Sequence, residues 1–324
     1  MWAKIRRVLM ILLAAVFLFC GGTVAVVQHQ YNVSKRLYRN ASSTFTEVQT
    51  QTPPEKVKDE KGVEIPVGEL APIKVDFEAL QKVNPDIIGW IYCPDTVIDY
   101  PVLHGEDNDT YLHHSFDRTY NASGSIFEDA YDLRGFLDSN FVLYGHHMAN
   151  GAMFATLDHW QREEYFDEHP VMWLLTPTQD YRVELFSAYH TSAYSDVYTI
   201  YRAPSPEFTE YLAKVQGYSY VKRDNVTLDP NARYALLSTC AYIFDDARSV
   251  LHGKLVPLDS AGGIPLRMMT VSEEQAAEAA KNEEKTGTDD EIRRPDNTER
   301  DPGTLPVELL NPSPSPSPET PETP

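Results

Sequence analysis

Residues 236–256, LLSTCAYIFDDARSVLHGKLV, contain a cysteine and an arginine whose spacing is suited to thiol chemistry. Cys240 ends one apolar run, and Arg248 begins another run eight residues later. If the two runs are antiparallel neighbours in a sheet, directly opposed residues have Cβ atoms about 5 Å apart. A permanent cation at that distance lowers a thiol pKa and stabilises a developing oxyanion. The alternative is an ordinary surface ion pair between Arg248 and Asp245 or Asp246 of the connecting loop.

A second candidate for this chemistry is the histidine pair that follows the apolar run 141–144. Gly145 ends that run, and His146 and His147 come next. A cysteine nucleophile needs a nearby proton acceptor and donor, and histidine titrates in the suitable pH range. Two strand ends can meet in a barrel although they are far apart in sequence. The chain has 10 histidines, so an ordinary surface or core role is the alternative. A metal site at the pair lacks a carboxylate at recognisable ligand spacing.

Short strands are the elements that would position these residues. Few helical patterns separate them, which favours a mostly β fold, a barrel or sandwich, over a parallel α/β sheet. A short helix is predicted from Phe77, ending before Asn84. A longer one is predicted over 205–217, between the sixth and seventh strands, because a Ser-Pro start is followed by apolar residues at i, i+3, i+4 and i+7. The predicted strands are 87–92, 97–102, 125–127, 141–144, 172–175, 182–189, 232–239 and 249–256.

The N-terminal region predicts a single membrane-spanning helix. Residues 8–27 are uncharged and long enough to cross a bilayer core of roughly 30 Å. Basic residues in 1–7 favour a cytoplasmic N-terminus, although further basic residues follow the apolar segment closely. A cleaved signal peptide is the alternative, but its apolar core is usually only about 7–15 residues long. Cys20 is expected to be buried in the membrane and inert.

The remaining chain divides by composition into three regions. Residues 28–72 are polar, with a possible helix over 31–49 followed by a stretch rich in helix breakers, which predicts an extracellular stalk. Residues 73–259 have the pattern of a folded domain. Residues 260–324 lack aromatic residues and end in a Pro-Ser run, which predicts a disordered, acidic, Pro-rich tail. A net charge of −20 argues against a nucleic-acid partner. The 3 cysteines are too few for a disulfide framework, and no zinc-binding spacing is present.

Together these motifs resemble those of the class B sortases, a family of cysteine transpeptidases. The resemblance covers about residues 77–258 and rests on IGWIYCPDTVIDYPVLHGEDNDTYL, GSIFED, YGHHMANGAMFATL and LLSTCAYIFDDARSVLHGKLV. It implies an eight-stranded, partly closed β-barrel with peripheral helices and a long helix between strands six and seven. It also implies an anchor in the Gram-positive cell membrane, with the catalytic domain outside the cell.

The resemblance further implies roles for individual residues. Cys240 would attack the threonine carbonyl of a sorting signal near the C-terminus of a secreted protein, forming a thioester. His146 would act as acid and base, and Arg248 would hold the substrate carbonyl and its oxyanion. An amine from a peptidoglycan precursor or a pilin lysine would then resolve the thioester, without a cofactor or metal. His147 is not expected to be catalytic. The residues expected to line the peptide groove are Asn108, Leu112 and Ser238.

Two other functions remain open at this point. One is a sortase-like cysteine peptidase in which water resolves the thioester. The other is a non-enzymatic anchored module that binds haem or a metal through its histidines. The joint presence of Cys240, His146 and Arg248 argues against the second. Cys93 departs from the family pattern, where an aliphatic residue is more usual. We expect it to be buried and inert, because a disulfide with Cys240 would abolish the nucleophile.

Overall fold

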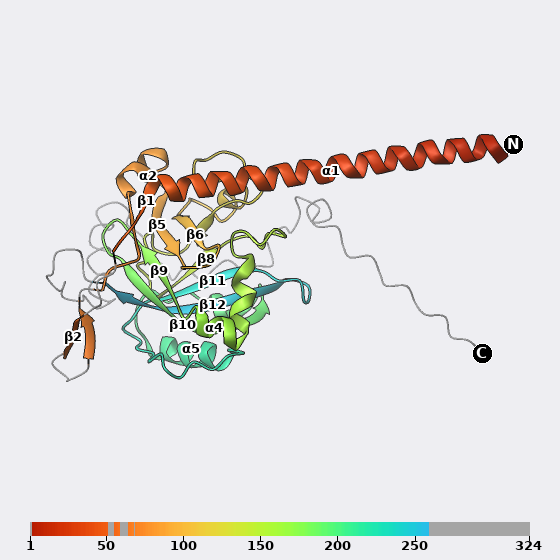
Figure 1. The fold of residues 1–324 in the computed structure, drawn as a ribbon. Coiled ribbons are helices and arrows are strands. Elements are labelled where there is room, and N and C mark those ends of the chain that lie inside the picture. Colours follow the sequence, from red (N-terminus) through yellow and green to blue (C-terminus); the bar gives the residue numbers. More distant parts are fainter. Residues whose placement is uncertain (1, 51–54, 59–63, 68, 259–324) are drawn as a thin grey trace, which may run out of the picture.

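Eight strands form a closed β-barrel in the computed structural model, which describes residues 2–50, 55–58, 64–67 and 69–258 (Figure 1). Each predicted strand overlaps one barrel strand, which confirms the predicted fold class. The order around the barrel is β10-β12-β11-β8-β7-β6-β5-β9, and β9 pairs again with β10, so the ring is fully closed rather than partly closed. The barrel strands are β5 (Ile87–Tyr92), β6 (Asp99–Leu103), β7 (Ile126–Glu128), β8 (Asn140–Tyr144), β9 (Val171–Leu175), β10 (Tyr181–Ser192), β11 (Tyr234–Cys240) and β12 (Ala247–Pro257).

The predicted helix between the sixth and seventh barrel strands is confirmed as α5 (Pro206–Gly217). The Ser205 side chain caps it by accepting a hydrogen bond from the Phe208 amide at 3.1 Å. The apolar stripe of α5 packs on the outer face of the barrel wall. The other elements are α1 (Trp2–Phe45), β1 (Thr46–Val48), β2 (Glu55–Lys58), β3 (Glu64–Val67), β4 (Ile73–Val75), α2 (Phe77–Val83), α3 (Thr110–His113), η1 (Ala155–Gln161), α4 (Glu163–Glu168) and η2 (Asp196–Tyr198).

Strand alternation gives the barrel two separate apolar cores. On β11, Ala235 and Leu237 point into the barrel interior and belong to the larger core. Tyr234 and Leu236 point outward, where they pack with α5 in the second core. Successive residues of a strand face opposite sides, so this alternation fixes the face on which each later residue of β11 lies.

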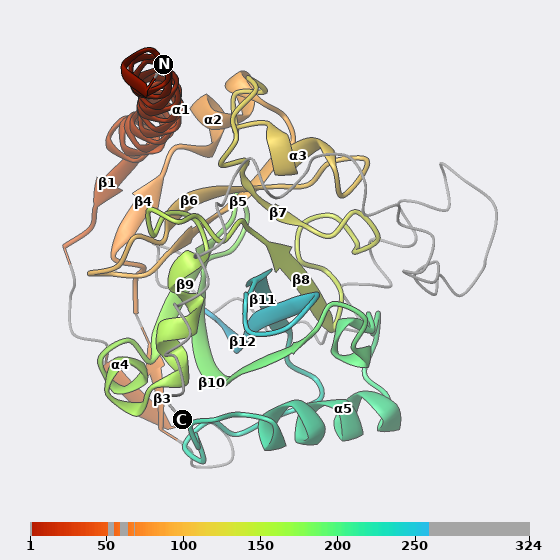
Figure 2. The same cartoon turned by 90° about the vertical axis from the view of Figure 1, so that its right-hand side faces the viewer.

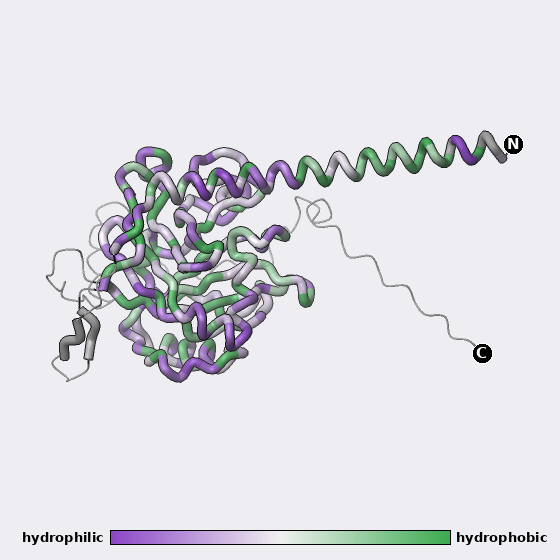
Figure 3. The backbone as a smooth tube through the Cα atoms, in the orientation of Figure 1, coloured by the Kyte–Doolittle hydropathy of each residue, from purple (hydrophilic) through white to green (hydrophobic). Residues whose placement is uncertain are grey.

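Helix α1 continues well beyond the apolar segment and packs on the barrel (Figures 1 and 3). Its exposed apolar part is the one helix in the described residues that is long and apolar enough to cross a membrane. Near its C-terminal end Ser34, Tyr38 and Ala41 are buried, and the Tyr38 hydroxyl donates to the Gly124 carbonyl.

This docked end of α1 lies within the stalk predicted over 28–72 and coincides with the possible helix predicted over 31–49, as far as Phe45. Buried residues at 34, 38 and 41 follow helical spacing, so one face of the polar segment is in fact a packing face. After the helix, β1 pairs with β4. Residues 51–54, 59–63 and 68 of the predicted stalk, and the predicted tail at 260–324, lie outside the described residues.

The second core contains a buried histidine that makes stability depend on pH. His252 is 2% exposed, and burial lowers its pKa to about 3. An unfolded histidine titrates near 6.5. The unfolded chain therefore binds a proton between these two values, and folding stability falls as pH falls through this window. We expect the free energy of unfolding to drop by about 2 kcal/mol more between pH 7 and pH 5 in the wild type than in His252→Gln. Denaturant titrations of both proteins at the two pH values measure this difference, and parallel pH profiles would contradict it.

Candidate active site

Three adjacent strands bring Cys240, Arg248 and His146 to one end of the barrel. Strand β11 pairs antiparallel with β12, and Cys240 lies directly opposite Arg248 in the register, which confirms the predicted pairing. Strand β11 also pairs parallel with β8, with Ser238 opposite Tyr144. The Gly145 amide extends this pairing by donating to the Ser238 carbonyl at 3.2 Å. Because β8 and β11 run in the same direction, His146 and Cys240 leave them at the same end, which faces the viewer in Figure 2.

The candidate site lies on the outer face of the barrel wall. Cys240 is four residues after Leu236 on β11, so both side chains point to the same side of the strand, and Leu236 packs in the second core outside the barrel. Arg248 is two residues before Val250 on β12, and Val250 also belongs to the second core, so Arg248 points outward as well. The thiol and the guanidinium therefore project from the same face of the sheet. Cys240 is partly exposed, and a substrate can therefore reach it.

The imidazole of His146 is held by the backbone of the segment that contains α3. Its Nε2 lies 2.8 Å from the Leu112 carbonyl oxygen. A carbonyl only accepts hydrogen bonds, so Nε2 carries the proton, and Nδ1 is the nitrogen that remains to accept one. Burial lowers the pKa of His146, and the Leu112 hydrogen bond only partly opposes this effect. The His113 ring, with its centroid 6.4 Å away, lowers it further. A neutral imidazole at pH 7 can act as a base.

Arg248 is available for an oxygen ligand. Its Nη1 donates to the Ala247 carbonyl at 3.0 Å. Across the residues that the structure describes, no ion pair joins Arg248 to a carboxylate, so the expected alternative of a pair with Asp245 or Asp246 is not formed. A guanidinium has five N–H groups in a planar fork, which leaves donors for a substrate carbonyl or an oxyanion.

The three residues expected to line a peptide groove have different environments. Asn108 is partly buried, and its amide donates to Asp129 Oδ1 at 3.0 Å. Leu112 is partly buried and reaches the site through its backbone carbonyl. The Ser238 side chain is 1% exposed, and its hydroxyl lies 2.8 Å from the Tyr198 hydroxyl. Contact of these three residues with a substrate stays a prediction.

A polar cluster beside the site was not anticipated from the sequence. Asp158 Oδ2 lies 3.3 Å from His147 Nε2, and Asp158 Oδ1 lies 3.4 Å from His190 Nε2. Burial alone would raise the pKa of Asp158, but hydrogen bonds from His147 and Ser249 and the two imidazoles lower it. The carboxylate therefore engages His147 and not His146. Within the described residues, no group of three or more His, Cys, Asp or Glu side chains forms a potential metal site.

The other cysteines do not join this site. Cys93 is 1% exposed, its thiol lies 3.6 Å from the Val171 carbonyl, and burial raises its pKa to about 12. A thiol with that pKa stays protonated and unreactive at neutral pH, as expected for this residue. Cys240 and Cys93 are both free, so no disulfide blocks the candidate nucleophile. Cys20 is exposed on the apolar part of α1.

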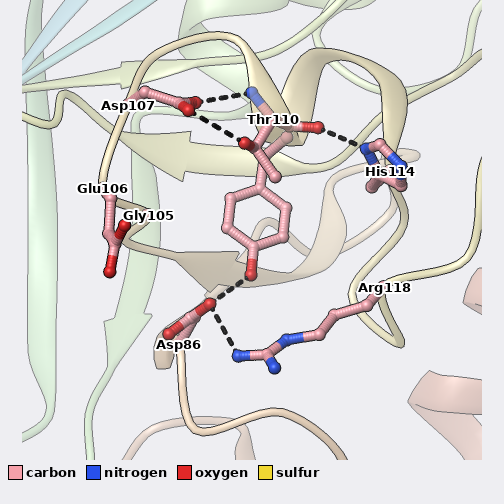
Figure 4. Close-up of a pocket in the computed structure, with 8 residues that line it drawn as sticks. Asp86, Gly105, Glu106, Asp107, Thr110, His114 and Arg118 are labelled. Carbon is pink, nitrogen blue, oxygen red and sulfur yellow. Dashed lines mark hydrogen bonds and ion pairs between the residues drawn. The ribbon is translucent and has the colours of Figure 1, made fainter.

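A polar pocket of about 420 Å³ lies beside α3 (Figure 4). Asp86 in this pocket accepts hydrogen bonds from the Tyr111 hydroxyl at 2.6 Å and from Arg118 Nη2 at 3.0 Å. Asp86 directly precedes β5, which runs parallel to β11, so it lies at the opposite end of the barrel from Cys240. Asp86 and Arg118 form an ion pair here, and Cys240, His146 and Arg248 are not among the residues that line the pocket.

A closed barrel with a thiol, an imidazole and a guanidinium at one end defines a thiol-dependent enzyme, and comparison with known proteins identifies its family. The chain is 33% identical over 253 residues to a sortase B of Listeria monocytogenes, covering 76% of this chain and 95% of the relative. The chain therefore belongs to the class B sortases, which are cysteine transpeptidases.

Solved structures agree with this assignment. The structure of Clostridium perfringens sortase B is matched at a TM-score of 0.52 and 37% identity, over 56% of this chain and all of that one (100%). A Staphylococcus aureus sortase B–substrate complex is matched at a TM-score of 0.53 and 30% identity, over 56% of this chain and 85% of that one. No family model matches the chain.

Proposed function

We propose that this sortase is anchored in the cell membrane by residues 8–27 and cleaves a C-terminal sorting signal after its threonine. It then transfers the secreted protein to an amine of a peptidoglycan precursor or a pilin lysine. The observation that carries the proposal is the direct opposition of Cys240 and Arg248 at the barrel end where β8 delivers His146. In this proposal the catalytic domain lies outside the cell and 1–7 in the cytoplasm.

The reaction begins with proton transfer from the Cys240 thiol to the neutral His146 imidazole at Nδ1. The thiolate attacks the threonine carbonyl carbon, and the electron pair of the C=O bond moves to oxygen. Arg248 donates N–H groups to this oxyanion. When the tetrahedral intermediate collapses, the C–N bond breaks, His146 returns the proton to the leaving amine, and a thioester remains on Cys240.

The second half of the reaction reverses these roles. The acceptor amine attacks the thioester carbon while His146 accepts a proton from the attacking nitrogen. Arg248 again stabilises the oxyanion. Collapse then breaks the C–S bond, and the proton on His146 returns to the Cys240 sulfur. Every proton that leaves a reactant is thus carried by one group, which fits a histidine held in place by the Leu112 carbonyl.

The membrane anchor is supported by the character of α1. The apolar part of the helix lies free of the barrel, with its large side chains exposed to the surroundings. In water, such a surface is unfavourable, whereas a bilayer covers it.

The test is incubation of the full chain, in detergent micelles, with a panel of sorting-signal peptides, with and without a short glycine peptide as the amine. We expect cleavage after threonine, ligated product when the amine is present, and an acyl adduct on Cys240 by mass spectrometry. Equal product without amine would favour the alternative hydrolase. Stoichiometric haem binding without cleavage of any peptide would favour the binding module.

Arg248 provides a prediction specific to oxyanion stabilisation. We expect Arg248→Ala to lower kcat/KM by about 10²- to 10³-fold, because removal of one oxyanion donor costs that much in other enzymes. Arg248→Lys should retain more activity than Arg248→Ala but less than the wild type, since an ammonium lacks the planar fork of the guanidinium. The control is Arg134→Lys, at an exposed arginine that donates to the Pro85 and His104 carbonyls. A kcat/KM for Arg248→Ala within about twofold of wild type would contradict the role.

A further inference from the structure

The hairpin between β11 and β12 carries an exposed apolar tip directly after the candidate nucleophile. We call residues 241–246 the hairpin tip. Tyr242 is 61% exposed, Ile243 is 59% exposed and Phe244 is 49% exposed. Three consecutive large apolar residues at a loop tip are unfavourable in water, and exposed apolar surface of this kind marks an interaction site. The tip also appears hydrophobic in Figure 3.

Neighbouring loops at the same barrel end present further apolar side chains. The strand pairings make β5 and β10 run parallel to β11, so the loops that follow all three strands lie at one end. Val97 in the loop after β5 is 44% exposed, and Tyr194 in the loop after β10 is 59% exposed. The Ala193 amide donates to the Asp246 carbonyl at 2.8 Å, which joins the loop after β10 to the hairpin tip. The apolar surface therefore extends across two adjacent loops.

This end of the barrel points in the same direction as the apolar part of α1. Figure 1 shows the β11–β12 hairpin projecting toward the side on which α1 leaves the barrel. Figure 2 views α1 nearly end-on and shows the same hairpin facing the viewer. Along the described part of α1, buried residues begin at Ser34, and the apolar segment ends at Val27. Seven residues of helix span only about 10 Å, so a bilayer around the apolar segment would begin close to the barrel.

The basic residues of α1 next to the barrel are suited to contact with a lipid surface. Lys35, Arg36 and Arg39 are exposed on the helix beside the barrel, where anionic headgroups would meet them. At the hairpin, Asp245 and Asp246 follow the apolar residues. Contact there would therefore be apolar in origin and would not need anionic lipid.

We infer that the hairpin tip rests in the boundary between headgroups and acyl chains of the leaflet where α1 leaves the membrane. This inference rests on the membrane anchor of the proposed function. Tyrosine suits such a boundary because its ring is apolar and its hydroxyl stays hydrated. A loop held about 5–10 Å deep would place Cys240, the residue before the tip, at the membrane surface. The site would then act on peptides that emerge from the same bilayer.

The experiment measures lipid contact of single labelled cysteines in the full chain. Cys20→Ser and Cys240→Ser remove the accessible thiols, and Cys93 stays buried. Bimane is attached at Ile243→Cys, and the protein is reconstituted in vesicles of equal parts phosphatidylcholine and phosphatidylglycerol, with or without nitroxide-labelled lipid. Thr178→Cys, on the exposed turn between β9 and β10 at the opposite barrel end, is the negative control. Val16→Cys, within the apolar segment, is the positive control.

We expect nitroxide-labelled lipid to quench about half of the bimane fluorescence at positions 243 and 16. The fluorescence of the label at position 178 should not change. Quenching at 16 without quenching at 243 would overturn the inference and leave the anchor intact. No quenching at 16 would overturn both. If 243 is unquenched and Ile243→Asn slows cleavage of a soluble sorting peptide, the tip belongs to the peptide groove and the inference also fails. In pure phosphatidylcholine the same quenching at 243 is expected, because the contact is apolar.

Discussion

Replacing Cys240 by alanine is expected to abolish cleavage of sorting-signal peptides and to remove the acyl adduct. The expected loss in kcat is on the order of 10³-fold or more, because no other side chain can replace the attacking sulfur. Cys240 is a free, partly exposed thiol opposite Arg248, whereas Cys93 is buried. Peptide cleavage followed by chromatography gives the rate, and intact-mass spectrometry of trapped enzyme gives the adduct.

The matched control for this prediction is Cys93→Ala. Its buried thiol contacts the Val171 carbonyl, and its pKa is raised to about 12. Removing it should cost about 1 kcal/mol of folding stability through a small cavity and leave turnover nearly unchanged. The proposed nucleophile would be refuted if Cys240→Ala cleaved peptide as fast as wild type, or if the adduct appeared on Cys93.

The strands and the register at the site were predictable because strand alternation and turn residues leave a local signal. That signal left a barrel and a sandwich open, and the choice of the barrel came from the family resemblance. The pairing that opposes Cys240 and Arg248 needs only a short connection between adjacent antiparallel strands. Helix α5 was equally predictable, since Ser205 and Pro206 mark its start and the apolar residues that follow have helical spacing. These features depend on residues close together in the chain.

Features that depend on distant segments were not predictable in the same way. The docking of α1 depends on Tyr38 reaching Gly124, and a mostly polar segment gives little sign of it. The group that holds His146 is the Leu112 carbonyl, and a backbone atom has no residue type to recognise. The link of Asp158 to His147 and His190 joins η1 to the segment after β8 and to β10, so no spacing in the sequence indicates it.

The alternation of side chains along β11 places the site on the outer wall of the barrel, and this position determines how a substrate can reach Cys240. Residues of β11 that point outward up to Leu236 are covered by the second core beneath α5. Cys240 lies beyond that cover, at the strand end, and is partly exposed. The same wall can therefore be rigid where it is packed and open where a peptide must bind.

The second large effect is expected for His146→Gln, with kcat/KM reduced by about 10³-fold because the reaction loses its proton carrier. The pH–activity profile of the wild type should also fall at low pH, and we call this fall the acid limb. Catalysis needs the neutral imidazole, burial lowers the pKa of His146 below its ordinary value, and activity should fall only as pH drops below about 6.5. Initial rates across a pH series measure both effects.

His147→Gln is the matched control, because it removes the adjacent imidazole on the same segment. His147 is engaged by Asp158, whereas His146 is held by Leu112, so the two substitutions test different positions with the same chemistry. We expect His147→Gln to stay within a few-fold of wild type and to keep the acid limb. An equal loss in both variants would assign the effect to distortion of the segment rather than to proton transfer. An acid limb centred above pH 6.5 would show that the imidazole of His146 is not the neutral base, since its environment lowers its pKa.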